Sequence, residues 1–196
     1  MNEIRMFGDR YGPAAAGTGS ARLAEKLRAF DSGRRLVEAA GNGAFDSGFF
    51  SIASVREEVD GLGGWERWLP DGAFWYASSA LGVLYVAAPD GCMWLVNTQV
   101  GSIMQTAFPL DEAVALVAKP STSDDLLMRP LFLAWIGAHH VLAPDCLLAS
   151  SPPVIESGAW TPESLVPTPS AEFLASTAAL FEPVGPTPIS IMEPGT

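Results

Sequence analysis

The sequence is poor in cysteine and has no long uninterrupted apolar run. Its two cysteines, Cys92 and Cys146, share no spacing motif, so we expect neither a disulfide framework nor a zinc knuckle, but two reduced core residues. The longest nearly uncharged stretch after residue 100, "PLFLAWIGAHHVLA", is shorter than the roughly 18 residues that suggest a membrane span. The first residues also lack the continuous apolar core of a secretory signal. We therefore expect a cytoplasmic protein without a membrane partner.

Basic residues are scarce beyond residue 69. Residues 1–69 contain nine Lys or Arg and ten Asp or Glu, a net charge of −1, whereas residues 70–196 contain two basic and twelve acidic residues, a net charge of −10. Nucleic-acid affinity depends on Lys and Arg that displace counterions from phosphates, so the sequence excludes a direct nucleic-acid partner. An acidic surface attracts basic proteins and speeds their association. The alternative is that the charge only keeps the protein soluble.

The middle of the chain has the composition that is typical of β-strands. Hydrophobic residues make up 48% of the chain, enough for a sizeable core. Aromatic and β-branched residues are enriched in four short segments separated by turn residues, which predicts an antiparallel β-meander with strands at 74–79, 83–88, 92–97 and 102–108. The central hairpin, "LGVLYVAAPDGCMWLVNT", is apolar at nearly every position, so both faces of the sheet should be covered.

Helical patterns flank this meander. Ser20 can cap a helix over 21–30, and Gly41 can end the helix that follows it. Further elements are expected as follows: a short strand at 49–52, two short helices within 55–69, and helices at 109–119, from Pro130 and from about Ser170. Residues 143–160 are expected to be an irregular connection. The resulting fold class is α+β: an antiparallel meander of about four to five strands covered by helices, with helical N-terminal and C-terminal segments.

No catalytic set can be assembled from the sequence. The two histidines, His139 and His140, are adjacent, and neighbours on a helix point about 100° apart, so they cannot both line one site. We expect a histidine that caps carbonyls at a helix end. A small hydrolase that pairs one histidine with Cys92 or Cys146 remains the enzymatic alternative. We expect no metal and no cofactor, because no ligand spacing or phosphate-binding loop is recognisable.

Two pairs of neighbouring carboxylates are candidates for acid–base chemistry. They are Glu57 with Glu58 and Asp124 with Asp125. Adjacent acids on helical segments usually decorate a solvated face or a helix start, which is the interpretation we adopt. Most of the six tryptophans should lie in the core, with Trp160 partly exposed.

The order of several short motifs resembles known families. "FGD", a helix that ends at "GNG", "FDSGFFSI" and "WERWL" resemble the GAD-like domain. The segment "ALGVLYVAAPDGCMWLVNTQVGSI" and the later stretch from "HVLAPDC" to "STAAL" resemble the C-terminal domain of type VI secretion immunity proteins of the Tdi type. The resemblance implies a GAD-like domain at 1–70, an immunity-type α+β domain at 71–182 and a Pro-rich tail at 183–196, which should be extended or mobile.

This resemblance implies a non-enzymatic immunity protein. Such a protein binds a cognate DNase effector as a heterodimer and masks or distorts its DNA-binding or active-site surface. The acidic half fits a basic nuclease, and the residues expected to contact it are Asp71, Asp90, Asp111, Glu112, Asp124, Asp125, Glu156 and Trp160. The alternative from another class is a SUKH-like adaptor or regulatory protein-binding domain.

Overall fold

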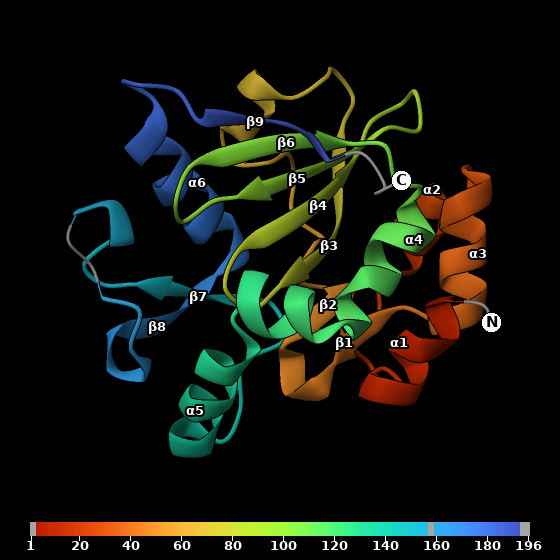
Figure 1. The fold of residues 1–196 in the computed structure, drawn as a ribbon, viewed down its shortest axis with the longest axis horizontal. Helices are drawn as coiled ribbons and strands as arrows, with labels where there is room; N and C mark the ends of the chain where they lie inside the picture. The colour runs from red at the N-terminus through yellow and green to blue at the C-terminus, as the bar shows by residue number, and fades with distance from the viewer. Residues whose placement is uncertain (1–2, 157–158, 193–196) are drawn as a thin grey trace.

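The computed structural model describes residues 3–156 and 159–192, which form an α+β fold (Figure 1). Its α-helices are α1 (Glu3–Tyr11), α2 (Ala21–Arg28), α3 (Asp31–Ala40), α4 (Leu110–Ala115), α5 (Arg129–His139) and α6 (Ser170–Phe181). Its strands are β1 (Gly43–Phe45), β2 (Phe50–Ile52), β3 (Phe74–Ser79), β4 (Val83–Ala87), β5 (Met93–Asn97), β6 (Ser102–Thr106), β7 (Cys146–Ser150), β8 (Leu165–Pro169) and β9 (Thr187–Met192). No helix in the described ranges is long and apolar enough to cross a membrane.

One sheet of seven strands forms the centre of the molecule, in the order β1-β2-β3-β4-β5-β6-β9. All neighbours are antiparallel except β6 and β9, which run parallel. Strands β7 and β8 pair separately. The ranges 1–70, 71–182 and 183–196 each contribute strands to the central sheet, because β2 pairs with β3 and β6 pairs with β9.

The predicted meander is confirmed as β3 to β6, and the sheet is covered on both faces. Alternate side chains of β4 enter two different clusters, because successive residues of a strand point to opposite faces. Tyr85 lies in the larger cluster with the residues of α1 to α5, whereas Leu84 and Val86 lie in a second cluster with Trp65 and with α6. Figure 1 shows α1 and α4 on one side of the sheet and α6 on the other.

The predicted helices are found near their expected positions. The Ser20 hydroxyl accepts a hydrogen bond from the Leu23 N–H (3.3 Å) and caps α2, and α3 ends at Gly41 with φ of 83°. Helices α4, α5 and α6 begin close to the expected residues. The lead that precedes α2 contains a further helix, α1, whose Phe7 packs edge to face on Phe45 at a centroid distance of 5.0 Å.

Three expectations are corrected. Within 55–69 only a 3-10 turn forms, at Trp65–Trp68, because Gly61, Gly63 and Gly64 adopt positive φ and prevent regular helix. Within 143–160 the chain forms β7 rather than an irregular connection. The Pro-rich tail is extended as expected, but as strand β9; residues 193–196 lie outside the described residues.

Proline is compatible with β9 because β9 is an edge strand. Thr187 donates its N–H to the Gly101 carbonyl (2.7 Å), so the N–H of the next position would point away from β6. That position is Pro188, which has no N–H to leave unpaired. The same feature leaves the free edge without a donor at this point.

Two turn glycines let α6 approach the sheet closely. Gly82 and Gly101 have φ of 79° and 65°, and a Cβ on either would collide with an aromatic ring of α6, Phe173 or Phe181. The second cluster therefore depends on the absence of side chains at both turns.

A buried carboxylate joins the N-terminal segment to the meander. Glu57 is 2% exposed, and its Oε1 accepts hydrogen bonds from the hydroxyls of Ser78 on β3 (2.7 Å) and Ser51 on β2. Its Oε2 accepts from the backbone N–H (2.8 Å) and the hydroxyl (2.5 Å) of Ser54. The expectation that both Glu57 and Glu58 lie on a solvated face is therefore wrong for Glu57, whereas Glu58 is exposed and pairs with Arg22 (3.3 Å).

Arg56, beside Glu57, is fully buried as well. Its guanidinium donates to the Gly48 carbonyl (2.8 Å) and to the Ser51 hydroxyl (3.3 Å). Burial lowers the pKa of Arg56 from its ordinary value, an effect that the negative charge of Glu57 opposes. The two charges lie side by side because neither could be buried alone without a large penalty.

The Glu57 network predicts a large effect of a small substitution. In Glu57→Gln, an NH₂ group replaces an acceptor that receives two hydrogen bonds, so at least one donor loses its partner. We expect the free energy of unfolding, measured by urea denaturation, to fall by about 2–4 kcal/mol.

Glu58→Gln is the matched control, and its effect should stay within about 1 kcal/mol because Glu58 is exposed. Equal effects of the two substitutions would contradict the assignment of the buried network to Glu57.

Candidate interaction surface

The structure brings two of the predicted contact residues together. Asp71 and Asp90 are both exposed. They lie in two turns that contact each other, as shown by Gly72 and Pro89: a Cβ on Gly72 would lie 3.1 Å from Pro89 Cγ. The two acids therefore belong to one end of the sheet, where β3 begins and where the chain turns from β4 into β5.

Two other predicted contact residues have partners within the protein. Asp111 is only 9% exposed, and both of its oxygens accept hydrogen bonds from Arg35, at 2.6 and 3.0 Å. Asp111 is thus not the exposed acid that was expected, because helix α4 packs on α3 and places this residue at their contact. Asp124 is half-buried and pairs with Arg10 (3.2 Å).

The remaining predicted residues belong to several different elements. Glu112 on α4 and Asp125 in the π-helical turn Ser121–Leu126 are exposed, as is Glu156 beyond β7. Trp160 is partly exposed, as predicted, and packs against the larger core cluster. The eight residues therefore do not form one continuous patch.

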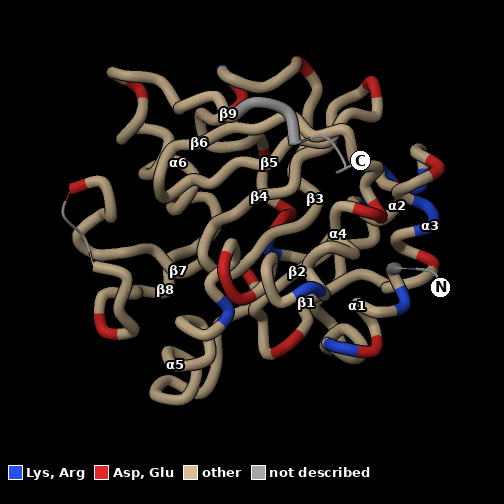
Figure 2. The backbone as a smooth tube through the Cα atoms, in the orientation of Figure 1, with Lys and Arg blue, Asp and Glu red and all other residues tan. Residues whose placement is uncertain are grey.

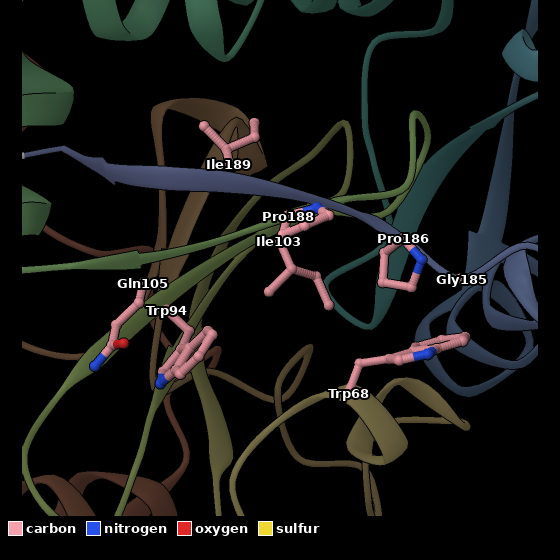
Figure 3. Close-up of a pocket in the computed structure, with 8 residues that line it drawn as sticks. All are labelled: Trp68, Trp94, Ile103, Gln105, Gly185, Pro186, Pro188 and Ile189. Carbon is pink, nitrogen blue, oxygen red and sulfur yellow. The ribbon is translucent and has the colours of Figure 1, made fainter.

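Sequence reasoning missed an apolar groove on the sheet (Figure 3). The groove has a volume of about 450 Å³ and lies where β5, β6 and β9 face the 3-10 turn Trp65–Trp68. Its lining residues are neutral: Trp68, Trp94, Ile103, Gln105, Gly185, Pro186, Pro188 and Ile189. Its lining residues come from positions 68 to 189, so no local sequence signal indicates it.

One end of the groove is polar. Trp94 and Gln105 are directly paired across β5 and β6, and Figure 3 shows the Gln105 carboxamide beside the Trp94 indole nitrogen. That nitrogen, Nε1, is buried and makes no hydrogen bond within the described part of the chain. A buried donor without a partner is unusual and destabilising in a folded protein.

Acidic residues stand next to this polar end. Asp90 lies in the turn just before β5, four positions from Trp94, and Asp71 lies in the neighbouring turn, where Gly72 meets Pro89. Asp71 also lines a second hollow of about 450 Å³, together with Glu66 and Arg67. The Arg67 guanidinium is already paired with Glu182 (2.7 Å).

Basic residues gather elsewhere. In Figure 2 the Lys and Arg segments are concentrated on α1, α2 and α3, away from α6, β7 and β8. Several of them form ion pairs with acids of the same helices, such as Arg28 with Glu25 and Arg34 with Asp31. Acids are found on these helices too, so the part of the molecule that contains α1 to α3 is close to neutral and the remainder is acidic.

The histidines and cysteines do not form a catalytic pair. The His139 ring stacks on Trp135 (centroid distance 4.5 Å), and its Nδ1 lies 2.9 Å from the Trp135 carbonyl oxygen, as expected for a histidine at a helix end. Burial and the neighbouring Asp145 raise the pKa of the Cys146 thiol, so fewer thiolates form at neutral pH. Among described residues, neither cysteine has a histidine as hydrogen-bond partner, and no cluster of three potential metal ligands is found.

Comparison with known proteins identifies the fold. Neither a protein family nor a curated protein sequence matches this chain. Among solved structures, the crystal structure of Atu4351 from Agrobacterium tumefaciens is similar, with a TM-score of 0.65 and 14% sequence identity over 97% of this chain and 92% of that chain. At this identity the similarity establishes a shared α+β fold.

The thiols should differ in reactivity in the folded protein. Cys92 is partly exposed, whereas Cys146 is buried and its pKa is raised. We expect iodoacetamide to alkylate Cys92 at least about tenfold faster than Cys146, as followed by mass spectrometry of the two peptides. The rates should converge in denaturant; faster alkylation of Cys146 in the native protein would instead indicate an activated nucleophile.

Proposed function

We propose that this protein is a cytoplasmic immunity protein that binds a cognate DNase effector of type VI secretion as a heterodimer and neutralises it without catalysis. The observation that carries the proposal is the scarcity of Lys and Arg outside α1 to α3, which leaves an acidic remainder with several exposed carboxylates. The motif order that resembles GAD-like and Tdi-type immunity domains supports the same function.

The exposed acids provide the attraction. Asp71, Asp90, Glu112, Asp125 and Glu156 are exposed, and none forms an ion pair with a described residue. A DNase must present Lys and Arg to the phosphates of its substrate. The acids therefore compete with DNA for the same basic surface and speed the encounter with the nuclease.

Apolar contacts supply the residence time. Exposed charges at the rim of an interface mainly change the association rate, whereas buried aromatic and aliphatic anchors slow dissociation. The neutral groove with Trp68 and Trp94 is the surface of this protein best suited to such an anchor. Once bound, the protein masks or distorts the DNA-binding or active-site surface of the nuclease.

The SUKH-like adaptor is the competing proposal, and it uses the same surface. It differs only in the partner, which would not be a nuclease. The hydrolase alternative has weaker support, since His139 is held on Trp135 and Cys146 is buried.

The proposal is tested with a candidate DNase effector encoded next to the gene for this protein. We expect the purified proteins to form a 1:1 complex whose association rate falls about tenfold between roughly 50 and 500 mM salt, because exposed charges guide the encounter. In a plasmid-cleavage assay, equimolar protein should abolish DNA cutting, and co-expression should restore growth.

The variant with both His139→Ala and His140→Ala should protect as well as the wild type, which separates an inhibitor from a histidine-dependent hydrolase. Persistent DNA cleavage in the presence of excess wild-type protein, without a complex, would contradict the proposal.

A further inference from the structure

We infer that the groove binds an extended segment of the effector in which an apolar side chain is flanked by Lys or Arg. The inference rests on the proposed function, because the effector is the partner. It assigns the contact to the face formed by β5, β6, β9 and the turn Trp65–Trp68, rather than to the dispersed acids alone.

The residues that line the groove indicate that the bound segment contributes an apolar side chain. A volume of about 450 Å³ bounded by tryptophan, isoleucine and proline side chains suits a large aliphatic or aromatic side chain. Further exposed apolar residues lie near the groove. Ile189, which lines it, is 49% exposed, and Val184, which precedes the lining residue Gly185, is 81% exposed. Val100 lies in the β5–β6 turn, which contacts β9. Exposed apolar residues near an apolar groove on an acidic protein favour an interaction site.

The polar end of the groove suits a main chain. Trp94 Nε1 is a buried donor without an acceptor among the described residues, and the Gln105 carboxamide beside it offers both a donor and an acceptor. A rotation of the Gln105 side chain would admit a peptide carbonyl to Nε1 while the carboxamide bonds the adjacent peptide group. An apolar molecule without polar groups would leave Nε1 unpaired.

The acids in the neighbouring turns indicate that the bound segment is basic beside its apolar residue. Among the residues that the structure describes, no Lys, Arg, Asp or Glu lines the groove, whereas Asp71 and Asp90 lie in turns near its polar end. A basic residue adjacent to the buried apolar one would reach these carboxylates, and an acidic residue there would be repelled. Nucleic acid is disfavoured for the same reason.

The occupant is held by side chains rather than by strand addition. The free edge of β9 has no N–H at Pro188, so a new strand could not complete a ladder there. The contact therefore depends on the groove and on the Trp94–Gln105 pair.

Replacement of Trp94 by β-(3-benzothienyl)alanine is the sharpest test, because it keeps the bicyclic ring and exchanges only the Nε1–H donor for a sulfur atom. Since that donor is unpaired in the free protein, stability in urea should be unchanged or increased. Affinity for the purified, catalytically inactive effector, measured by calorimetry, should nevertheless fall by about 5- to 30-fold. A structural role alone would lower stability and leave affinity unchanged.

Two matched comparisons locate the contact. Ile189→Arg places a cation on the groove and should weaken binding by about 100-fold or more. Its control is Val141→Arg, at an apolar site that is 71% exposed in the loop after α5, which should change the affinity less than about threefold.

The second comparison concerns charge. Asp71→Asn with Asp90→Asn should slow association about tenfold. Glu163→Gln with Glu172→Gln, the same change in net charge at exposed sites elsewhere, should have a much smaller effect.

The outcomes separate this inference from the proposed function. If wild-type protein does not bind the effector, the proposed function fails. If wild-type protein binds and the Trp94, Ile189 and Asp71/Asp90 variants all bind equally well, the groove assignment is overturned and the interface lies elsewhere. Should Ile189→Arg disturb β9, the Trp94 and Asp71/Asp90 variants decide the question, because neither changes a residue of that strand.

Discussion

The buried carboxylate of Glu57 fixes the geometry on which the rest of the structure depends. It receives hydrogen bonds from β2, from β3 and from the Ser54 turn, so the N-terminal segment cannot slide against the meander without breaking several of them. The chain leaves this point for the glycine-rich stretch and the turn that carries Trp65 and Trp68. The turn itself, which forms one wall of the groove, is held by α6, because the Trp65 indole donates to the Thr177 hydroxyl (3.1 Å) and packs on the Phe181 ring.

The groove arises where the second layer of the sheet is incomplete. Trp65 and the aromatic residues of α6 cover β4 on this face and reach Val96 of β5 and Ile103 of β6, but they leave Trp94 only partly covered. Trp94 is left partly exposed beside β9 although its strand is apolar. A sheet covered on both faces at its centre and on only one face at its margin combines a stable core with an accessible apolar surface.

Much of the fold could be predicted because its signals are local. The period of the apolar residues in α2 and α3, the Ser20 cap and the turns of the meander each depend on a few neighbouring residues. Glu57 was misjudged because two adjacent acids look alike in sequence, and only the fold directs one inward to three serines. Strands β7 and β8 were missed because proline flanks or interrupts them.

The interaction surface was less accessible to sequence reasoning. Asp71 and Asp90 were identified from charge, and the turn geometry brings them together. Asp111 has the same charge but is neutralised by Arg35, a partner that no spacing rule indicates. The groove combines residues from positions 68 to 189, whose proximity depends on how distant strands pair.

The parallel pairing of β6 with β9 also bears on the order of folding. Ser102 and Thr187 are partners in this ladder, yet 85 positions separate them, so their contact closes a long loop and yields no gain until most of the intervening chain is placed. The hairpins of β3 to β6 close only short loops and can form early. The groove is therefore among the last features to be assembled, and a chain that has acquired its core but not this ladder lacks the surface for recognition. Competence to bind thus reports on completed folding.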